Sequence, residues 1–258
     1  MRGTTLLVLA VVAVVVIGAA AFFLLRAPAP QPTAAPPTVG ASKPGPTASS
    51  PVVAGKPPGQ VPTSPHPTPQ EESFQGCPGE GDGTDPELNR LKNRVDEAAW
   101  QPVTVEALLG LKWPEDIGRK HMAQWTSGDR ALIDPFNGVP VQTEGFLLQV
   151  RQEGPESPNC HSAEDFDFHT WLAAQPGDDR ATRSVVIEFT PRVRAQHPTW
   201  TLQALEVLAR QKTPVRVSGW TMLDPEHPDE VGKSRGTIWE VHPVMQVETQ
   251  QGGNWKRL

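Results

Sequence analysis

Cysteine is nearly absent from this 258-residue chain, which contains only Cys77 and Cys160. So few thiols exclude a cysteine-rich zinc module and a dense disulfide scaffold, although one bridge can still form. If the two cysteines pair, closing a loop of roughly 84 residues would remove about 4 to 5 kcal/mol of unfolded-state entropy. The alternative is two independent free thiols.

The chain also lacks an HExxH helix, paired CxxC motifs and an EF-hand register, so no common metal motif is present. Basic charge is in short supply. Residues 76–258 hold 19 Lys plus Arg against 27 Asp plus Glu, a net charge of −8. An acidic domain disfavours nonspecific nucleic-acid binding, which needs Lys and Arg to displace phosphate counterions.

An apolar run does occur at the start of the chain. Residues 6–25 carry no charge and are bounded by Arg2 and Arg26. Twenty such residues match the hydrocarbon thickness of a bilayer, so we expect residues 1–26 to be a transmembrane signal anchor. A cleaved signal peptide is the competing interpretation. The short N-terminus favours the cytoplasmic side, which predicts a single-pass cell-membrane protein whose C-terminal domain is extracytoplasmic, either periplasmic or at the cell surface.

Residues 27–75 contain 14 prolines in 49 positions, with Ala, Ser, Thr and Gly filling most of the rest. This composition cannot form a core and predicts a disordered Pro-rich linker. Its upper reach is on the order of 150 Å at about 3.1 Å per residue, enough to hold a domain clear of the membrane.

Residues 76–138 predict a helical N-terminal extension of the folded domain. Asp85 is suited to cap a helix that begins at Pro86 and ends near Trp100. A second short helix is expected at residues 104–111 and a third at residues 115–125.

Residues 139–258 predict a mainly β domain. Strands are expected at residues 139–151, 167–173, 184–190, 215–223 and 237–248, with a helix at residues 202–210 between the third and fourth. The last strand alternates with a period of two, which indicates one buried face. Gly145 and Gly219 stand where the apolar pattern changes phase, which indicates bends. Two bent strands suit a small, highly curved barrel of five strands in the order β-β-β-α-β-β.

This order resembles the oligonucleotide/oligosaccharide-binding (OB) fold. Five segments carry a narrower resemblance: EGPESPNCH (153–161), DFHTWL (167–172), VVIEFTPRVR (185–194), GWTMLDPEH (219–227) and GTIWEVHPV (236–244). They are similar to an uncharacterised bacterial family with an OB-like core, an ESCNC-type loop and a WEIHP-type last strand. The resemblance implies the fold but no activity. Pro158 stands where that loop often has its first cysteine, so two-cysteine chemistry is not implied.

Strand parity also suggests a metal site. Asp167 and His169 leave one face of the second strand, and the third and fifth strands are neighbours in an OB barrel. We therefore expect side chains from these strands and a nearby loop to approach one another and to offer imidazole and carboxylate ligands to a divalent ion. The candidate ligands are His161, His169, Glu188, Glu240 and His242. The alternative is a solvated acidic loop with structurally hydrogen-bonded histidines.

A second candidate site is basic and aromatic. Residues 180–216 hold seven basic residues against two acidic ones, which suits an anionic or glycan ligand or a protein partner. The candidate ligand-binding residues are Arg183, Arg192, Arg194, Arg216 and, as a surface stacking residue, Trp171. Ion pairing of the arginines with acidic loops is the competing interpretation.

Two functions follow from these features. The first is a membrane-anchored extracytoplasmic OB-like binding or scaffold module without catalytic residues or cofactor. The second is a metal-dependent hydrolase, nuclease-like, that uses Asp, Glu and His residues at the loop ends. Fold analogy alone does not decide between them.

Overall fold

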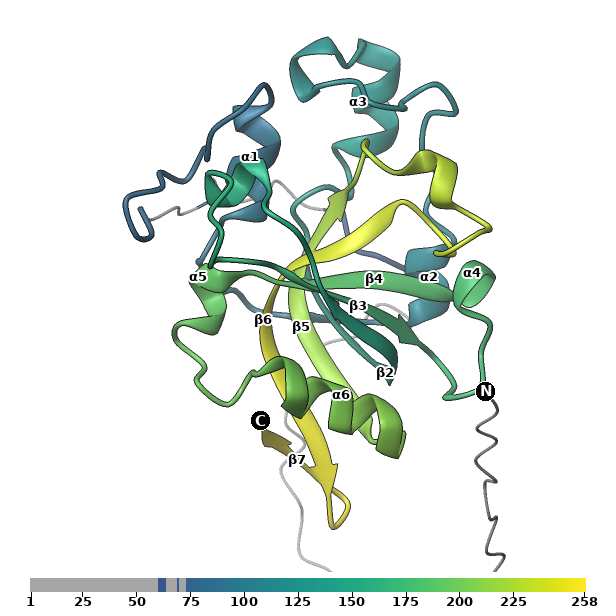
Figure 1. Ribbon diagram of the computed structural model, residues 1–258. Helices are drawn as coiled ribbons and strands as arrows, with labels where there is room; N and C mark the ends of the chain where they lie inside the picture. Colours follow the sequence, from purple (N-terminus) through teal and green to yellow (C-terminus); the bar gives the residue numbers. More distant parts are fainter. Residues whose placement is uncertain (1–59, 64–68, 70–72) are drawn as a thin grey trace, which may run out of the picture. The chain divides into compact units, whose positions relative to one another are not determined.

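The computed structural model of the protein describes residues 60–63, 69 and 73–258 (Figure 1). The predicted transmembrane segment and most of the predicted linker lie outside these residues. Among the residues that are described, no helix is both long and apolar enough to cross a membrane. Val61 falls inside the predicted linker, yet it is only 5% exposed and belongs to the hydrophobic core. The packed domain therefore begins upstream of residue 76. The sequence could not indicate this, because a single valine among prolines has no periodicity that reveals its burial.

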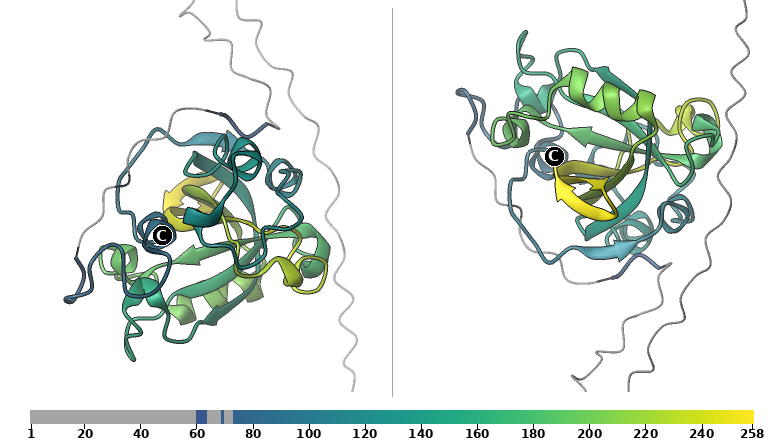
Figure 2. Two further views of the ribbon diagram at one scale, coloured as in Figure 1. Left: turned by 90° about the horizontal axis from the view of Figure 1, so that it is seen from above. Right: turned by 90° about the horizontal axis from the view of Figure 1, so that it is seen from below.

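Five strands close into a barrel, as the sequence predicted. They are β2 (Pro140–Gln152), β3 (Phe168–Ala173), β4 (Ser184–Phe189), β5 (Pro214–Leu223) and β6 (Trp239–Gln251). The strands pair in the order β2-β3-β4-β6-β5, and β5 pairs with β2 to complete the ring. All pairs in the ring are antiparallel except β4 and β6, which run parallel. The views from above and below show the strands curving around a common interior (Figure 2).

Gly145 and Gly219 permit close backbone approaches that a side chain would block. A Cβ on Gly145 would lie 2.4 Å from the carbonyl oxygen of Ala173, and one on Gly219 would lie 2.4 Å from that of Pro243. The β5–β6 register shifts on both sides of Gly219, and the β2–β3 register shifts just after Gly145. The irregularities expected from the phase changes are therefore present in both strands.

Short helices lie at both ends of the barrel. Figure 1 shows α1 and α3 at one end, and α6 with strand β7 (Asn254–Arg257) at the other. α6 starts after Thr201, whose side chain accepts a hydrogen bond from the Ala204 N–H, and it buries Leu205 and Leu208. The helices and 3-10 turns are α1 (Pro86–Lys92), α2 (Val105–Leu109), η1 (Met122–Gln124), α3 (Ser127–Ile133), η2 (Ser157–Asn159), α4 (Arg180–Arg183), α5 (Pro191–Arg194), α6 (Leu202–Gln211) and η3 (Pro228–Glu230).

The N-terminal extension differs from its prediction in two places. The helix that begins after Asp85 ends at Lys92 rather than near Trp100, and the chain continues into β1 (Gln101–Val103), which pairs in parallel with β2. The helix predicted at residues 115–125 is wrong, because these residues form turns and η1. The helix α3 begins after Thr126 instead, where Thr126 and Asp129 form a reciprocal capping box.

Strands β3 and β4 bury both of their faces. Phe168, Ile187 and Phe189 share one face, and Phe189 makes an edge contact with Trp200 at 5.5 Å between ring centroids. The opposite face carries His169 and Glu188. The last strand likewise buries both faces from Trp239 to Met245. The expectation of a single buried face there is wrong, because loops and the N-terminal extension cover the second face.

A disulfide links the N-terminal extension to the loop after β2. It joins Cys77 and Cys160, whose Cα atoms are 5.8 Å apart. Of the two alternatives left open by the sequence, the structure therefore has the bridge. The guanidinium of Arg192 donates hydrogen bonds to the carbonyls of Cys77 and Pro78 at 3.1 and 2.8 Å, which ties the bridged segment to the end of β4.

Candidate functional site

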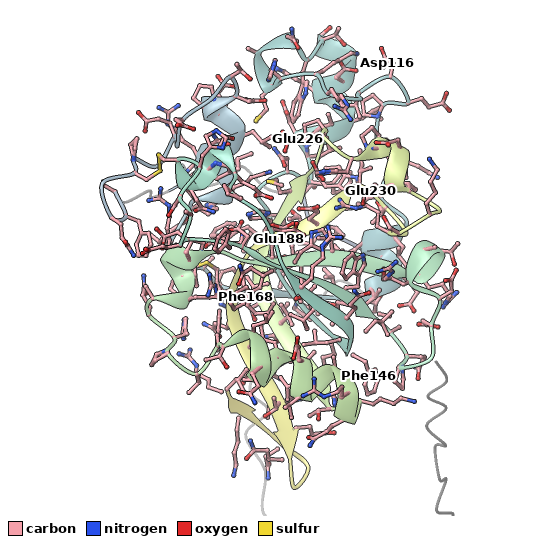
Figure 3. The ribbon with its side chains drawn as sticks, viewed as in Figure 1. Asp116, Phe146, Phe168, Glu188, Glu226 and Glu230 are labelled. Atoms are coloured by element: carbon pink, nitrogen blue, oxygen red, sulfur yellow. A yellow bond between two sulfur atoms is a disulfide. The ribbon has the colours of Figure 1, made fainter. Side chains whose placement is uncertain are left out.

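Ionisable side chains gather on the face of β3, β4 and β6 that is opposite the α6 side. His169 lies across from Glu188, and Glu240 lies across from Val186. Because side chains alternate along a strand, His242 shares the face of Glu240. Figure 3 shows Glu188 near the centre of the domain, with Glu226 and Glu230 on the loops above it. We call the following residues the buried cluster: Asp167, His169, Asp224, Glu188, Arg235, Glu240 and His242.

His242 is surrounded by carboxylates. Its Nε2 lies 3.6 Å from Asp167 Oδ2, and its Nδ1 lies 3.5 Å from Glu188 Oε2 and 3.4 Å from Glu240 Oε2. Asp167, Glu188 and His242 are all buried, and each offers a donor atom within 4.8 Å of the other two. One imidazole and two carboxylates at this spacing can hold either a shared proton or a divalent cation.

His169 joins Glu188 to the loop after β2. Its Nδ1 lies 3.0 Å from Glu188 Oε1 and 3.0 Å from Glu153 Oε1. Burial opposes the charged form of this imidazole, but the two hydrogen-bonded carboxylates outweigh burial and raise the pKa of His169 to about 9. His169 is therefore an imidazolium at neutral pH and stabilises the charge on Glu188.

Arg235 neutralises the opposite side of the buried cluster. Its Nη1 donates to Glu240 Oε1 at 2.6 Å and to Asp224 Oδ2 at 2.9 Å. Asp224 also accepts from the Nδ1 of His227 at 2.7 Å. Burial would raise the pKa of Asp224, but His227 and Arg235 hold the pKa of this carboxyl well below its usual range. The loop after β5 is thus fixed to the barrel by charge pairs.

The environments of Asp167 and Glu188 push their pKa values apart. Burial raises the pKa of Asp167 to about 6, and the negative charge of Glu188 adds to that rise against the attraction of His242. Burial acts on Glu188 too, but the positive charges of His242, His169 and Lys92 hold the pKa of Glu188 well below its usual range. Glu188 is therefore the fixed anion of the pair, and Asp167 is the one that exchanges a proton first.

A cleft of about 670 Å³ lies next to the buried cluster. Two barrel loops contribute to it: the loop between β2 and β3, and the loop between β5 and β6. The N-terminal extension supplies the remaining walls through α1 and residues 119–121. The charged and imidazole side chains that line it are Asp85, Lys92, Arg119, Lys120, His121, Glu156, His161, Glu226 and His227.

Cations dominate this lining. Lys92 is buried, which opposes its charge, but Glu226 and Asp224 outweigh burial and hold the pKa of Lys92 above its usual value. The hydrogen bond to Asp224 raises the pKa of His227 to about 9. Burial and the charges of Glu188 and Asp167 raise the pKa of Glu156 to about 8, so this carboxyl is largely protonated at pH 7. The net charge of the cleft is therefore more positive than a count of its acidic and basic residues suggests.

Four of the five predicted metal ligands converge. His169, Glu188, Glu240 and His242 belong to one network of contacts. His161 does not join them, because it sits in the loop after β2, is exposed, and pairs with Asp82 at 3.1 Å. It lines the cleft instead. A loop residue has no strand parity, so its direction could not be predicted.

Trp171 is not the surface stacking residue that the sequence predicted. It is 1% exposed. The guanidinium of Arg180 lies 4.6 Å from its ring centroid, that of Arg151 lies 5.1 Å away, and the ring of His169 lies 4.5 Å away. These neighbours cover the indole, so its face is not available to a sugar or a base.

The four predicted arginines do not form one patch. Arg183 pairs with Asp178 at 3.1 Å, and Arg216 pairs with Glu248 at 2.7 Å. Arg192 and Arg194 donate to backbone carbonyls, and Arg194 also stacks over Phe168 at 3.6 Å. The expected common patch is therefore wrong, because β4 separates Arg183 from Arg192 and Arg194 and each guanidinium already has a partner inside the chain.

Four further residues belong to the buried cluster or to the cleft but are not among the predicted metal ligands: Asp167, Lys92, Asp224 and Arg235. The parity of Asp167 with His169 was the available signal for the first. No local signal marked Lys92, which meets Glu226 at 3.1 Å across 134 residues of sequence.

Residues 232–236 spell GKSRG, which matches the GxSxG pattern of hydrolase nucleophiles. That motif needs a sharp turn from a strand into a helix, whereas these residues lie between η3 and β6. The Ser234 hydroxyl donates to Glu230 at 2.7 Å. This serine is therefore not arranged as a nucleophile.

Comparison with known proteins finds no family model and no curated protein that matches this chain.

Proposed function

We propose that this protein is an extracytoplasmic binding module with an OB-type barrel, anchored in the cell membrane by its N-terminal segment and held away from it by the Pro-rich spacer. The strand order and the parallel β4–β6 pair support the OB class. Resemblance to the bacterial family with an OB-like core agrees with it.

The position of the cleft carries the proposal. OB folds bind ligands with the loop between their first two strands and the loop between their last two. Here the corresponding loops follow β2 and β5, and both line the 670 Å³ cleft through Glu156, Ser157, Glu226 and His227. A cavity at these two loops supports an OB-type binding site for an oligosaccharide or an oligonucleotide.

Arg119 supports an anionic ligand. It is exposed on the cleft wall, its N–H donates to the Pro225 carbonyl at 2.6 Å, and its guanidinium has no ion-pair partner among the described residues. The other basic residues of the wall are already paired: Lys92 with Glu226, and Lys120 with Asp116. A guanidinium with free donors beside the imidazolium of His227 suits a carboxylate or phosphate group. We propose an acidic oligosaccharide as the ligand.

A binding screen on the full-length protein in detergent tests this function. Acidic and neutral oligosaccharides of equal length, and a single-stranded oligonucleotide, would be compared by calorimetry. We expect the acidic glycan to bind and Arg119→Gln to weaken it about 10-fold, the effect of one charge-assisted contact. Arg257→Gln is the matched control, because Arg257 is exposed on β7 and does not line the cleft. Equal binding of acidic and neutral glycans, or no effect of Arg119→Gln, would refute the proposal.

A metal-dependent hydrolase is the second candidate. The observation that favours it is the convergence of Asp167, Glu188 and His242 beside Glu156, which faces the cleft. A metal held there would supply a Lewis acid that activates water. None of its three ligands lines the cleft, so Glu156 is the residue that would exchange protons with a substrate. Turnover of chromogenic phosphodiesters or glycosides that needs zinc or manganese, and that Asp167→Asn abolishes, would support this function over simple binding.

A further inference from the structure

Two buried polar atoms face each other without a hydrogen bond. They are Asp167 Oδ2 and His242 Nε2, which are 3.6 Å apart and have no hydrogen-bond partner among the described residues. Both residues are at most 1% exposed. Leaving a buried polar atom without a partner destabilises the folded state, and more so when the group is charged. Such a pair indicates a position between or beside them that a ligand can fill.

The contacts of His242 orient its lone pair. Its Nδ1 faces Glu188 Oε2 and Glu240 Oε2 at 3.5 and 3.4 Å. A proton on Nδ1 that is donated to Glu240 leaves the lone pair of the neutral ring on Nε2 and leaves Glu188 Oε2 without that proton. That lone pair is directed at Asp167 Oδ2, so two acceptors meet. Either a second proton on the ring or a metal cation satisfies both atoms, and zinc uptake distinguishes the two.

We propose that Asp167, Glu188 and His242 form a binding site for one divalent transition-metal ion, and that the ion is zinc. Ligand atoms at about 2.0 to 2.1 Å from a tetrahedral zinc lie roughly 3.3 to 3.4 Å apart. The 3.6 Å gap between Asp167 and His242 is close to this spacing. One donor atom of Glu188 lies within 4.8 Å of a donor atom on each of the other two residues, so an approach of at most roughly 1.5 Å brings the three donors to the spacing of one tetrahedral ion.

Each proposed ligand is held by a different neighbour. Asn159 donates to Asp167 Oδ1 at 2.9 Å. His169 lies 3.0 Å from Glu188 Oε1. Glu240 lies 3.4 Å from His242 Nδ1. Groups of this kind orient metal ligands and strengthen their basicity, and carboxylate–histidine pairs are the commonest form.

The donor set favours zinc over magnesium and calcium. Mg²⁺ and Ca²⁺ prefer six or more oxygen ligands, including carbonyls and water. One imidazole and two carboxylates suit Zn²⁺, which is stable with three protein ligands and one open position. This site does not depend on the acidic-glycan proposal, because none of its three ligands lines the cleft.

A metal-binding measurement on the full-length protein tests the site. The protein in detergent would be stripped with a chelator, titrated with Zn²⁺ against a chromophoric competitor, and analysed by elemental mass spectrometry. We expect one zinc per chain, not displaced by millimolar Mg²⁺ or Ca²⁺. Co²⁺ substitution should give visible bands of a tetrahedral site with nitrogen and oxygen ligands, a readout that needs no variant. Failure of the stripped wild-type protein to take up zinc would overturn the proposal.

Variants then locate the ion. Asp167→Asn and His242→Gln should remove stoichiometric zinc, and Asn159→Ala should weaken it about 10- to 100-fold through its effect on Asp167. His161→Gln and His227→Gln are the matched controls, because both imidazoles lie outside the three-ligand set, and they should keep one zinc. Tryptophan fluorescence checks that each variant is folded. Zinc bound equally by a folded Asp167→Asn protein, or lost in either control, contradicts this location.

Discussion

The guanidinium carbon of Arg94 lies 3.3 Å from the ring centroid of Trp220. Arg94 is buried, and its Nε and Nη2 donate to the carboxylate of Asp96 at 2.9 and 2.7 Å. The indole N–H of Trp220 donates to the Asp96 carbonyl at 3.2 Å, and Trp100 packs edge-on against the same indole. This group joins the N-terminal extension to β5, so the extension is part of the barrel's structure and not an appendage.

Removing this guanidinium should destabilise the whole domain. Arg94→Met keeps the length of the side chain but removes the cation over Trp220 and the paired donors to Asp96. Loss of one partner from a buried pair leads us to expect about 3 kcal/mol lower stability. Urea unfolding followed by tryptophan fluorescence measures it. Arg210→Met is the control, because Arg210 is exposed and, within the part of the chain that the structure describes, pairs only with Glu206 of α6. It should change stability by less than about 0.5 kcal/mol. Equal effects of the two variants would show that Arg94 is structurally dispensable.

Gly219 should tolerate no side chain. The Cβ of Gly219→Ala would lie 2.4 Å from the Pro243 carbonyl and 2.6 Å from Val241 Cγ1, so β5 and β6 would have to separate. We expect a loss of about 3 kcal/mol or more, at the upper end for overpacking. Gly177→Ala is the matched control, because a Cβ there meets no atom within 4 Å. The thermal midpoint of each variant gives the comparison, and a Gly219→Ala protein as stable as Gly177→Ala would contradict the close approach.

The barrel could be predicted because its signals are local. The alternation along β6 and the phase changes at Gly145 and Gly219 can each be recognised within a single strand. The cap of α6 at Thr201 is also a local signal, because it lies next to the helix that it caps. The extension was predicted less well. Asn93 ends α1 early, and the capping box at Thr126 lies just beyond residues 115–125, where a helix is predicted.

The alternation of side chains along the strands predicted correctly which strand residues of the candidate site meet. It could not predict the positions of the loop residues. His169, Glu188 and His242 meet because strand pairing sets their face. His161 had no parity to direct it, and Arg235 reaches Glu240 only because the loop after β5 folds over the strands. The face of β3, β4 and β6 that carries these residues is buried only because distant segments of the chain pack over it. No local sequence pattern indicates such packing.

The disulfide should contribute much of the domain's stability. Cys77 and Cys160 are 83 residues apart in sequence, and freeing a loop of that length returns about 4 to 5 kcal/mol of conformational entropy to the unfolded chain. The variant with both Cys77→Ser and Cys160→Ser should therefore unfold at a clearly lower urea concentration. Reductant should lower the midpoint of the wild-type protein and leave the serine variant unchanged. Identical midpoints with and without reductant would show that the bridge does not constrain the unfolded chain.

The His227–Asp224 pair should make stability depend on pH above neutrality. The Nδ1 of His227 lies 2.7 Å from Asp224 Oδ2, and this contact raises the pKa of His227 to about 9, against the opposing effect of burial and Arg235. A raised imidazole pKa means that the pair's contribution is complete below about pH 6.5, the unfolded value, and is lost as pH rises through about 9.

The loss should be modest, because the His227 side chain is 47% exposed and solvent screens the pair. We expect on the order of 1 kcal/mol between pH 6.5 and 9.5. Because Glu156 and His169 also titrate in this range, the measured quantity is the difference between wild type and His227→Gln in urea unfolding at each pH. That difference should be largest near pH 6 and vanish by pH 10. A constant difference across the range would mean that His227 acts through packing alone, since packing does not change as the imidazole loses its proton.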